Sequence, residues 1–293
     1  MSRIIDKLPQ PKTKAPVKVI VATASRTGTL SVYEAMKVLG YKTFHMKECV
    51  HESGVPHMEV LAEAIQAQYS PLSGIKRYSR PDFDKWLAEY DCIVEIPYFL
   101  GPGLLNAYAD DPNIKFILTD RDPDKWVTSM NSTAGEIVTK MKQFPLNVLH
   151  YFNRDLHKFV MLHKVIYEAI ADGTVPGDRN NEAAMRRNYV SYIEMAKSVL
   201  PADRLLFFHL EDGLGWEQIC AFLHLPTPDQ PFPTPHIQEN FRSNVRDWLK
   251  PRIQNAMMTL AAVVVPVVGS LVYFGIKNWA AFWPGSEEYN KST

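Results

Sequence analysis

Two repeating patterns of apolar residues alternate along most of the chain. Four short runs are dense in β-branched and aromatic residues, as is typical of buried parallel strands, and they lie at 17–24, 91–97, 114–120 and 204–210. Elsewhere apolar positions recur at helical spacing and predict helices at 30–40, 81–90, 103–111, 122–141, 147–171, 180–199 and 215–225. Strands separated by helices predict an α/β fold of three layers, with a central parallel sheet flanked by helices.

The C-terminal part of the chain follows neither pattern. Residues 256–276 include no charged side chain over 21 positions, which is long enough for a helix to cross a bilayer. Basic residues precede this span, and Trp279 and Trp283 follow it. This asymmetry predicts a single-pass membrane anchor with the main domain on the cytoplasmic side, the endoplasmic reticulum being one candidate membrane. The alternative is a buried core helix, although Pro266 and Gly269 suit a membrane helix better.

These patterns divide the chain into three parts. We expect an N-terminal arm at 1–16, an α/β domain at 17–250, and the membrane anchor with a short tail at 251–293.

Lys+Arg and Asp+Glu are equal at 32 each, and this balance argues against a general nucleic-acid binder. Three widely spaced cysteines fit neither a zinc site nor a disulfide framework, so we expect no metal.

A small polar loop, Ser25-Arg26-Thr27-Gly28-Thr29, follows the first predicted strand and precedes a helix. Backbone N–H groups at the start of a helix bind anions, and a glycine lets the backbone approach them closely. Arg26 adds a guanidinium suited to phosphate, and Thr27 and Thr29 add hydroxyl groups. The nucleoside-triphosphatase pattern does not fit, because it requires a lysine where Thr29 stands. The alternative is an ordinary strand-to-helix turn.

A second polar loop follows the third predicted strand. Arg121 begins it, Asp122-Pro123 reads as a helix start, and Ser129 comes eight residues after Arg121. Because parallel strands end at the same edge of a sheet, the two loops are candidates for one ligand site. The Arg121 guanidinium and the Ser129 hydroxyl could together bind a second phosphate. The alternative is a surface ion pair of Arg121.

Together the two loops resemble those of the sulfotransferases that use 3′-phosphoadenosine 5′-phosphosulfate (PAPS), a family with a P-loop-like fold. The resemblance covers residues 17–236 and is strongest to a fungal-type branch, in Arg26 to Met46, 117–129 and 205–233. It implies that Arg26, Thr27, Gly28 and Thr29 hold the 5′-phosphosulfate. It also implies that Arg121 and Ser129 hold the 3′-phosphate.

This chain departs from the family pattern at two positions. Leu30 stands where the family usually carries a second hydroxyl residue of the first loop. Glu95, in Glu95-Ile96-Pro97, stands where the cytosolic small-molecule enzymes of the family carry a catalytic histidine. The resemblance therefore makes Glu95 the candidate general base, with Arg26 assisting catalysis. His45 is a second candidate base. The alternatives are an ion pair for Glu95 and a structural hydrogen bond for His45.

Aromatic residues supply a candidate pocket for an apolar acceptor. The candidates are Tyr98, Phe99, Tyr151 and Phe152, with Phe159 and Tyr167 further along the same segment. At helical spacing such residues also serve as core, and that alternative stays open. His150, His157 and His163 have no carboxylate or cysteine partners at metal-ligand spacing.

The sequence thus predicts a membrane-tethered enzyme with a nucleotide cosubstrate. It would transfer a sulfonate from PAPS to the hydroxyl of an apolar small molecule, such as a terpenoid or sterol-like alcohol, or activate that alcohol through the sulfonate. The alternative is a repurposed member of the fold. Such a protein would bind a phosphorylated or prenylated ligand and catalyse cyclisation or elimination, or bind without catalysis.

Overall fold

The computed structural model describes all residues except 1, 53, 235–236 and 283–293, and describes no side chain at 237–242 or 280–282. Trp283, predicted to follow the anchor, lies outside the described residues. Five parallel strands form one sheet in the order β2-β3-β1-β4-β5. Their bounds are β1 Val19–Val21, β2 Thr43–Phe44, β3 Cys92–Val94, β4 Lys115–Asp120 and β5 Leu205–His209. The four predicted strands are present, whereas β2 is too short to leave a periodic signal.

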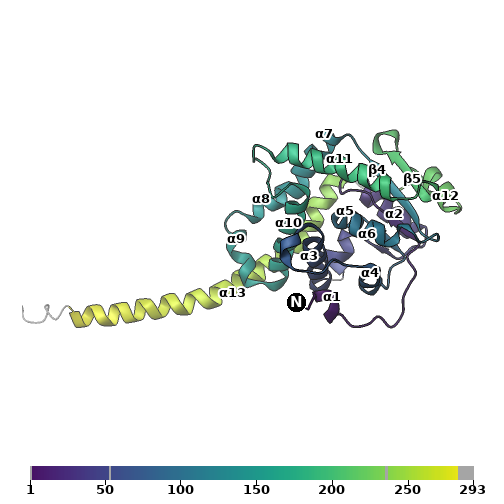
Figure 1. Cartoon of the computed structure of the whole chain (residues 1–293). Helices are drawn as coiled ribbons and strands as arrows, with labels where there is room; N and C mark the ends of the chain where they lie inside the picture. Colours follow the sequence, from purple (N-terminus) through teal and green to yellow (C-terminus); the bar gives the residue numbers. More distant parts are fainter. Residues whose placement is uncertain (1, 53, 235–236, 283–293) are drawn as a thin grey trace, which may run out of the picture.

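Helices cover both faces of this sheet (Figure 1). Val19 and Val21 of β1 face α2 (Thr29–Val38) and α12 (Trp216–Leu223) on one side, in a cluster with Val32 and Ile219. Ile20 faces the larger cluster on the other side. The helices contributing to that side are α3 Val55–Tyr69, α4 Arg80–Trp86, α5 Ile96–Leu100, α6 Pro102–Ala109, α7 Pro123–Met130, α10 Arg154–Ile170 and α11 Asn181–Val199. The predicted three-layer α/β fold is confirmed.

Two predicted long helices are interrupted. The segment 122–141 passes from α7 through a wide turn, η3 (Asn131–Gly135), into α8 (Glu136–Met141). The segment 147–171 divides into α9 (Leu146–Leu149), η4 (His150–Phe152) and α10. Asn153 causes the second break, since its backbone is extended (φ −146°, ψ 123°) and its side chain caps α10 by accepting from Leu156 N at 2.9 Å. Short helical turns complete the fold at η1 Glu48–Glu52, η2 Pro71–Ser73, η5 Ala202–Arg204 and η6 Leu210–Asp212.

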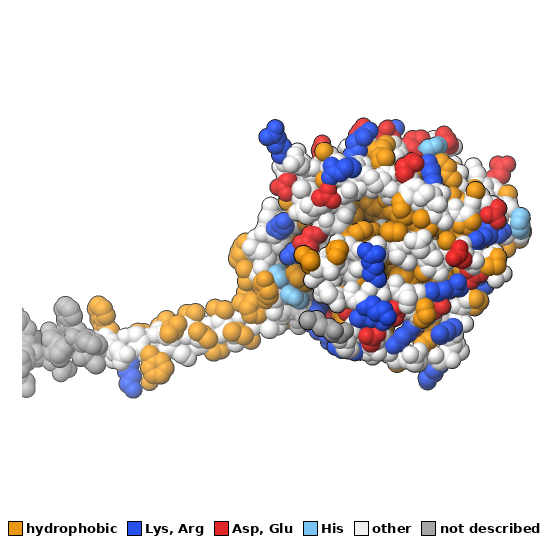
Figure 2. Space-filling view, in the orientation of Figure 1, with side chains coloured by type: hydrophobic (Ala, Val, Ile, Leu, Met, Phe, Trp, Pro, Cys, Tyr) orange, Lys and Arg blue, Asp and Glu red, His pale blue; other side chains and the backbone are white. Residues whose placement is uncertain are grey.

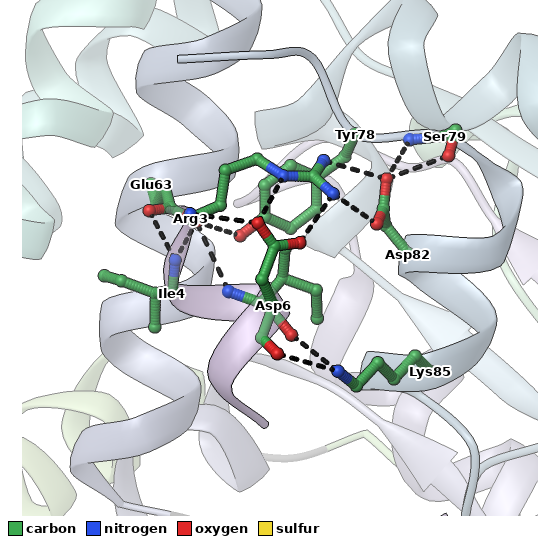
Figure 3. A network of polar contacts seen from close by, with 9 residues as sticks. Arg3, Ile4, Asp6, Glu63, Tyr78, Ser79, Asp82 and Lys85 are labelled. Atoms are coloured by element: carbon green, nitrogen blue, oxygen red, sulfur yellow. Dashed lines mark hydrogen bonds and ion pairs between the residues drawn. The ribbon is translucent and has the colours of Figure 1, made fainter. Parts of the chain in front are cut away.

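The start of the chain is fastened to the domain rather than forming a free arm. The short helix α1 (Ile4–Lys7) buries Ile5 completely. Arg3 donates to both carboxylate oxygens of Asp82 at 2.8 and 3.0 Å (Figure 3). The buried Glu63 accepts from Ile4 N at 2.7 Å and from Tyr78 Oη at 2.6 Å. These contacts hold residues 3–6 against α3 and α4.

The C-terminal helix α13 (Ile237–Phe282) starts well before the predicted span and leaves the domain as a single rod (Figure 1). Its first part packs on the domain, with Trp248 and Ala256 buried. Its outer part is exposed and largely apolar (Figure 2), so a buried core helix is wrong for 257–279. Ser243–Trp279 is long and apolar enough to cross a membrane, with a mean hydropathy of 2.1 in its most apolar window. The predicted boundary at Lys250 falls inside the packed part of this helix.

Candidate active site

The loop after β1 has an unusual backbone. Arg26 and Gly28 take positive φ angles of 69° and 89°, and Gly28 is the residue that precedes α2. A Cβ atom on Gly28 would lie 3.0 Å from Leu210 Cδ1, so the loop also passes close to the end of β5. A positive φ at a non-glycine residue is strained and is found mainly at functional sites. This backbone leaves the N-terminus of α2 without a side-chain cap.

The two threonines of this loop have different surroundings. Thr27 is fully buried, and its hydroxyl donates to the Ala24 carbonyl at 2.6 Å. The Thr119 hydroxyl in turn donates to the Thr27 carbonyl at 2.7 Å. The Thr27 hydroxyl therefore braces the loop, whereas the sequence predicted it as a phosphate contact. Thr29, by contrast, lines a cavity beside Arg26.

The second loop meets the first one. Arg26 Nε donates to Ser129 Oγ at 3.2 Å, and Arg121 Nη1 donates to the Arg26 carbonyl at 2.9 Å. Burial lowers the pKa of Arg26; the Glu95 carboxylate opposes this effect and the Arg121 guanidinium adds to it. The structure thus brings together the residues that the sequence assigned to two ends of one nucleotide.

Arg121 also retains donor capacity. Its buried Nε has no hydrogen-bond partner among the described residues, and the Glu211 carboxylate lies 3.8 Å away. A buried unpaired guanidinium N–H is costly unless an acceptor satisfies it. The position of this donor fits an anionic ligand such as a phosphate. The ion pair considered for Arg121 is therefore present, but it is long and leaves this donor unsatisfied.

An aromatic stack supports the second loop from behind. The rings of Trp126 and Tyr189 lie 4.4 Å apart at 17°. Trp126 Nε1 donates to the Ser25 carbonyl at 2.8 Å, which ties this stack to the first loop. Tyr189 Oη accepts from Arg121 N at 2.9 Å. Asp122 caps α7 by accepting from Lys125 N at 2.8 Å, as its place before Pro123 suggested.

Glu95 follows β3 and also has a positive φ, of 67°. Its Oε1 accepts from Ser25 Oγ at 2.6 Å, and its Oε2 lies 2.9 Å from His45 Nε2, a charge contact rather than a well-aligned hydrogen bond. Burial alone raises the pKa of Glu95, but His45, Ser25 and Arg26 outweigh it, so the pKa is lowered. Glu95 is thus a charged carboxylate with both oxygens in contact, and the alternative of an ion pair is present.

The neighbouring His45 is oriented by its backbone surroundings. Its Nδ1 accepts from Lys47 N at 3.1 Å, so Nε2 is the nitrogen that carries the proton. Nε2 lies 2.9 Å from Glu95 Oε2 without a well-aligned hydrogen bond, so Nδ1 is the ring nitrogen engaged by one. His45 consequently has the structural role considered as its alternative, and it is poorly placed to accept a proton.

A cavity of about 120 Å³ lies directly beside Arg26 and Glu95. Its other lining residues come from helices far apart in the chain, so the sequence had indicated few of them. They are Leu30, Met46, Val50, Phe159, His163, Asn244 and Val245. The last two belong to α13. Leu30, the departure from the family pattern, supplies apolar surface here. Only the three-dimensional arrangement shows this convergence, since apolar residues on helices look alike in sequence whether they line a cavity or a core.

The predicted acceptor aromatics do not gather at this cavity. Tyr98 and Phe99 line a separate cavity of about 360 Å³ between α3, α5, α10 and α11. Figure 2 shows apolar side chains in a hollow beneath α11. Tyr151 is exposed, and Phe152 packs near Ala256 of α13. Of the aromatic residues considered, Phe159 is the one that lines the Arg26–Glu95 cavity.

A larger groove of about 530 Å³ runs between α8, α9 and the base of α13. Ile137, Met141 and Ile253 give it apolar walls, and Lys140 and Lys250 are also among its lining residues. Val245 borders both this groove and the Arg26–Glu95 cavity.

In the described part of the chain, no three potential metal ligands gather at one place.

The fold and the site define a parallel α/β protein in which two strand-end loops bring Arg26, Arg121 and Ser129 together. A sulfotransferase-domain family model matches residues 18–241, so the chain belongs to that family. The chain is 32% identical over 267 residues to Ava biosynthesis cluster protein M of Aspergillus versicolor, covering 88% of this chain and 96% of that protein. A sulfotransferase crystal structure from Alicyclobacillus acidocaldarius aligns at 11% identity over 85% of this chain and 96% of that chain, with a TM-score of 0.37 that adds nothing to the assignment.

Proposed function

We propose that the protein is a PAPS-dependent sulfotransferase that acts on an apolar alcohol from a membrane-tethered position. The observation that carries the proposal is the meeting of Arg26, Arg121 and Ser129, which come from two loops about 100 residues apart. The buried Arg121 Nε supports it, because this donor has no hydrogen-bond partner among the described residues and a bound phosphate would supply an acceptor.

The two loops would divide the nucleotide between them. The backbone N–H groups from Gly28 onward, with Arg26 and the Thr29 hydroxyl, would hold the 5′-phosphosulfate. Arg121 and Ser129 would hold the 3′-phosphate. Because Arg26 Nε donates to Ser129 in this structure, the bound nucleotide would have to replace that bond with contacts to its own oxygens. When bound, PAPS supplies the sulfonate and a phosphate leaving group.

Positioning and charge stabilisation are the main demands of such a transfer, by analogy with phosphoryl transfer. Arg26 lies beside the cavity and would stabilise the charge that develops on the departing 5′-phosphate. Glu95 is the candidate base proposed from the sequence. Its oxygens already accept from Ser25 and contact His45, so it would take a proton only after one of these groups turned away.

The acceptor would be an apolar hydroxylated molecule, such as a terpenoid or sterol-like alcohol. Leu30, Val50 and Phe159 make much of the cavity wall apolar. Val245 connects this wall with the groove at the base of the exposed helix, which would give a membrane-dissolved acceptor a short route. The similar Aspergillus versicolor protein is named for a biosynthesis cluster, which agrees with a small-molecule substrate.

A calorimetric titration with 3′-phosphoadenosine 5′-phosphate (PAP) tests the nucleotide site. We expect wild-type protein to bind PAP, and Arg121→Ala to weaken binding about 10- to 100-fold, since a hydrogen bond to a charged group is worth about 1.5–3 kcal/mol. Arg186→Ala is the matched control, because Arg186 is an exposed arginine that pairs with Asp124 on the surface. No binding by wild-type protein, or equal affinity of both variants and wild type, would contradict the proposal.

The repurposed or non-catalytic alternative is favoured by one observation. Leu30 replaces a hydroxyl donor of the phosphate loop and instead lines the cavity. A protein of this kind would bind PAP and transfer no sulfonate to any alcohol. Incubation with ³⁵S-labelled PAPS and a panel of terpenoid alcohols, by wild-type protein that binds PAP, separates the two functions.

We further propose that α13 anchors the domain in a membrane with the active site on the cytoplasmic side. The exposed apolar surface of 257–279 supports this placement. Truncation after Leu260 keeps Trp248 and Ala256, which pack on the domain, and removes most of the exposed span. We expect the truncated protein to be soluble and to bind PAP like the full chain. Continued sedimentation with membranes would contradict the anchor.

A further inference from the structure

His163 is a histidine of α10 that faces the Arg26–Glu95 cavity. Its Nδ1 lies 2.9 Å from the Phe159 carbonyl oxygen, one helical turn earlier. A carbonyl oxygen only accepts hydrogen bonds, so Nδ1 must carry the proton and Nε2 must hold the lone pair. The helix backbone thereby fixes the tautomer that a proton acceptor needs.

The other basic groups around the cavity are less available. His45 has its lone pair engaged by Lys47 N, and its other nitrogen, Nε2, carries the proton and lies 2.9 Å from Glu95 Oε2. Glu95 has one oxygen bonded to Ser25 and the other beside His45. His51 is exposed to solvent at the edge of the cavity. Among the described cavity residues, only His163 combines a fixed acceptor nitrogen with a position inside the cavity.

We propose that His163 Nε2, rather than Glu95, takes the proton from the acceptor hydroxyl. This inference rests on the proposed sulfotransferase function. In the step, the acceptor oxygen forms a bond to sulfur, and the bond from sulfur to the 5′-phosphate oxygen breaks with its electron pair leaving on that phosphate. The acceptor O–H bond breaks, and its proton moves to Nε2.

Charge around His163 suits this role. Burial lowers its pKa to about 4, so the ring is neutral and ready to accept at physiological pH. A pKa this far below the operating pH makes His163 a weak base, so it would take the proton late, when the new bond to sulfur has made the attacking oxygen acidic. The Glu95 carboxylate opposes the lowering and would stabilise the imidazolium. The other charged or titratable groups around the cavity are Arg26, His45, Lys47 and His51.

The test compares two acceptors with His163→Gln. Farnesol, an aliphatic alcohol, must lose a proton during transfer, whereas p-nitrophenol is already ionised at mildly alkaline pH. A general base contributes about 10²- to 10⁴-fold. We therefore expect His163→Gln to lower farnesol sulfonation at least about 100-fold and p-nitrophenol sulfonation only a few-fold. Affinity for PAP should stay within about threefold of wild type, a change of less than 1 kcal/mol.

His157→Gln is the matched control, because His157 lies on the same helix but contacts His150 outside the cavity. It should leave both reactions near wild type. An equal loss with both acceptors would show a structural role for His163, and unchanged farnesol turnover would overturn the inference. Absence of PAP binding, or of transfer to either acceptor, by wild-type protein would instead overturn the proposed function, and the inference with it.

Nitrogen-15 NMR of the histidine rings gives a readout independent of turnover. We expect the His163 signals, assigned by their loss in His163→Gln, to show a protonated Nδ1 and an unprotonated Nε2 at neutral pH. The opposite tautomer would overturn the inference even if turnover falls.

Discussion

The proposed nucleotide side and the proposed acceptor side of this site are built in opposite ways. The nucleotide side consists of three strand ends whose polar groups are locked together, with strained backbone at Arg26 and Glu95. The acceptor side is assembled from helices, and one of them, α13, continues away from the domain as an exposed rod. The difference indicates that the proposed nucleotide side is held by its own loops, whereas the proposed acceptor side depends on the helix that we propose as the membrane anchor.

Arg26→Ala removes a charged group from the proposed nucleotide side and should have the largest effect on turnover. Removing a group that stabilises developing charge typically costs about 10²- to 10³-fold in turnover, so we expect a loss of that size with labelled PAPS. The positive φ of Arg26 also strains alanine, so Arg26→Gly serves as the second variant. Both variants should lose turnover alike while retaining wild-type circular dichroism. Normal turnover in either would remove Arg26 from the site.

Lowering the pH should reduce the free energy of unfolding through protonation of His163, a residue of the proposed acceptor side. Because burial lowers its folded pKa to about 4, the unfolded chain binds more protons than the folded protein between about pH 6.5 and 4. Stability should therefore fall as the pH drops through that window, by up to about 3 kcal/mol from this group alone. Urea unfolding at several pH values measures it. His163→Phe should flatten the dependence, and an unchanged slope would contradict the burial of this ring.

Val245→Asp tests whether α13 contributes to acceptor binding and not to nucleotide binding. An unpaired polar group in an apolar wall costs roughly 1–3 kcal/mol and a carboxylate costs more, so we expect transfer to farnesol to fall at least about 10-fold. Affinity for PAP should change little, because Val245 belongs to α13 and to neither of the two loops. Asp247→Ala, at an exposed position of the same helix, should change neither quantity. A parallel loss of PAP affinity would show that the two sides are not separable.

The nucleotide side was also the part that the sequence could predict. Arg26 and Gly28 lie in the loop after β1, and Arg121 and Ser129 lie in the loop and helix after β4, so the shared edge of a parallel sheet is sufficient to place them together. His163 and Val245 could not be found in this way. They join the site only through the packing of α10 and α13, and helical periodicity does not distinguish a cavity wall from a core. The same limit explains why the sequence did not show that Tyr98 and Phe99 line a different cavity from Phe159.

Leu30→Ser addresses the boundary between the two sides and should have the smallest effect. A hydroxyl at this position restores the donor of the family pattern, and one hydrogen bond is worth about 0.5–1.5 kcal/mol, so we expect PAP affinity to rise about two- to tenfold. The same change removes apolar surface from the cavity, so transfer to farnesol should weaken, while Leu30→Ala should weaken transfer without the gain in affinity. Opposite movements of the two quantities in Leu30→Ser would mean that this chain has exchanged a phosphate contact for acceptor binding. If both rise together, Leu30 contributes nothing to acceptor binding and only weakens the phosphate loop, which would strengthen the repurposed alternative.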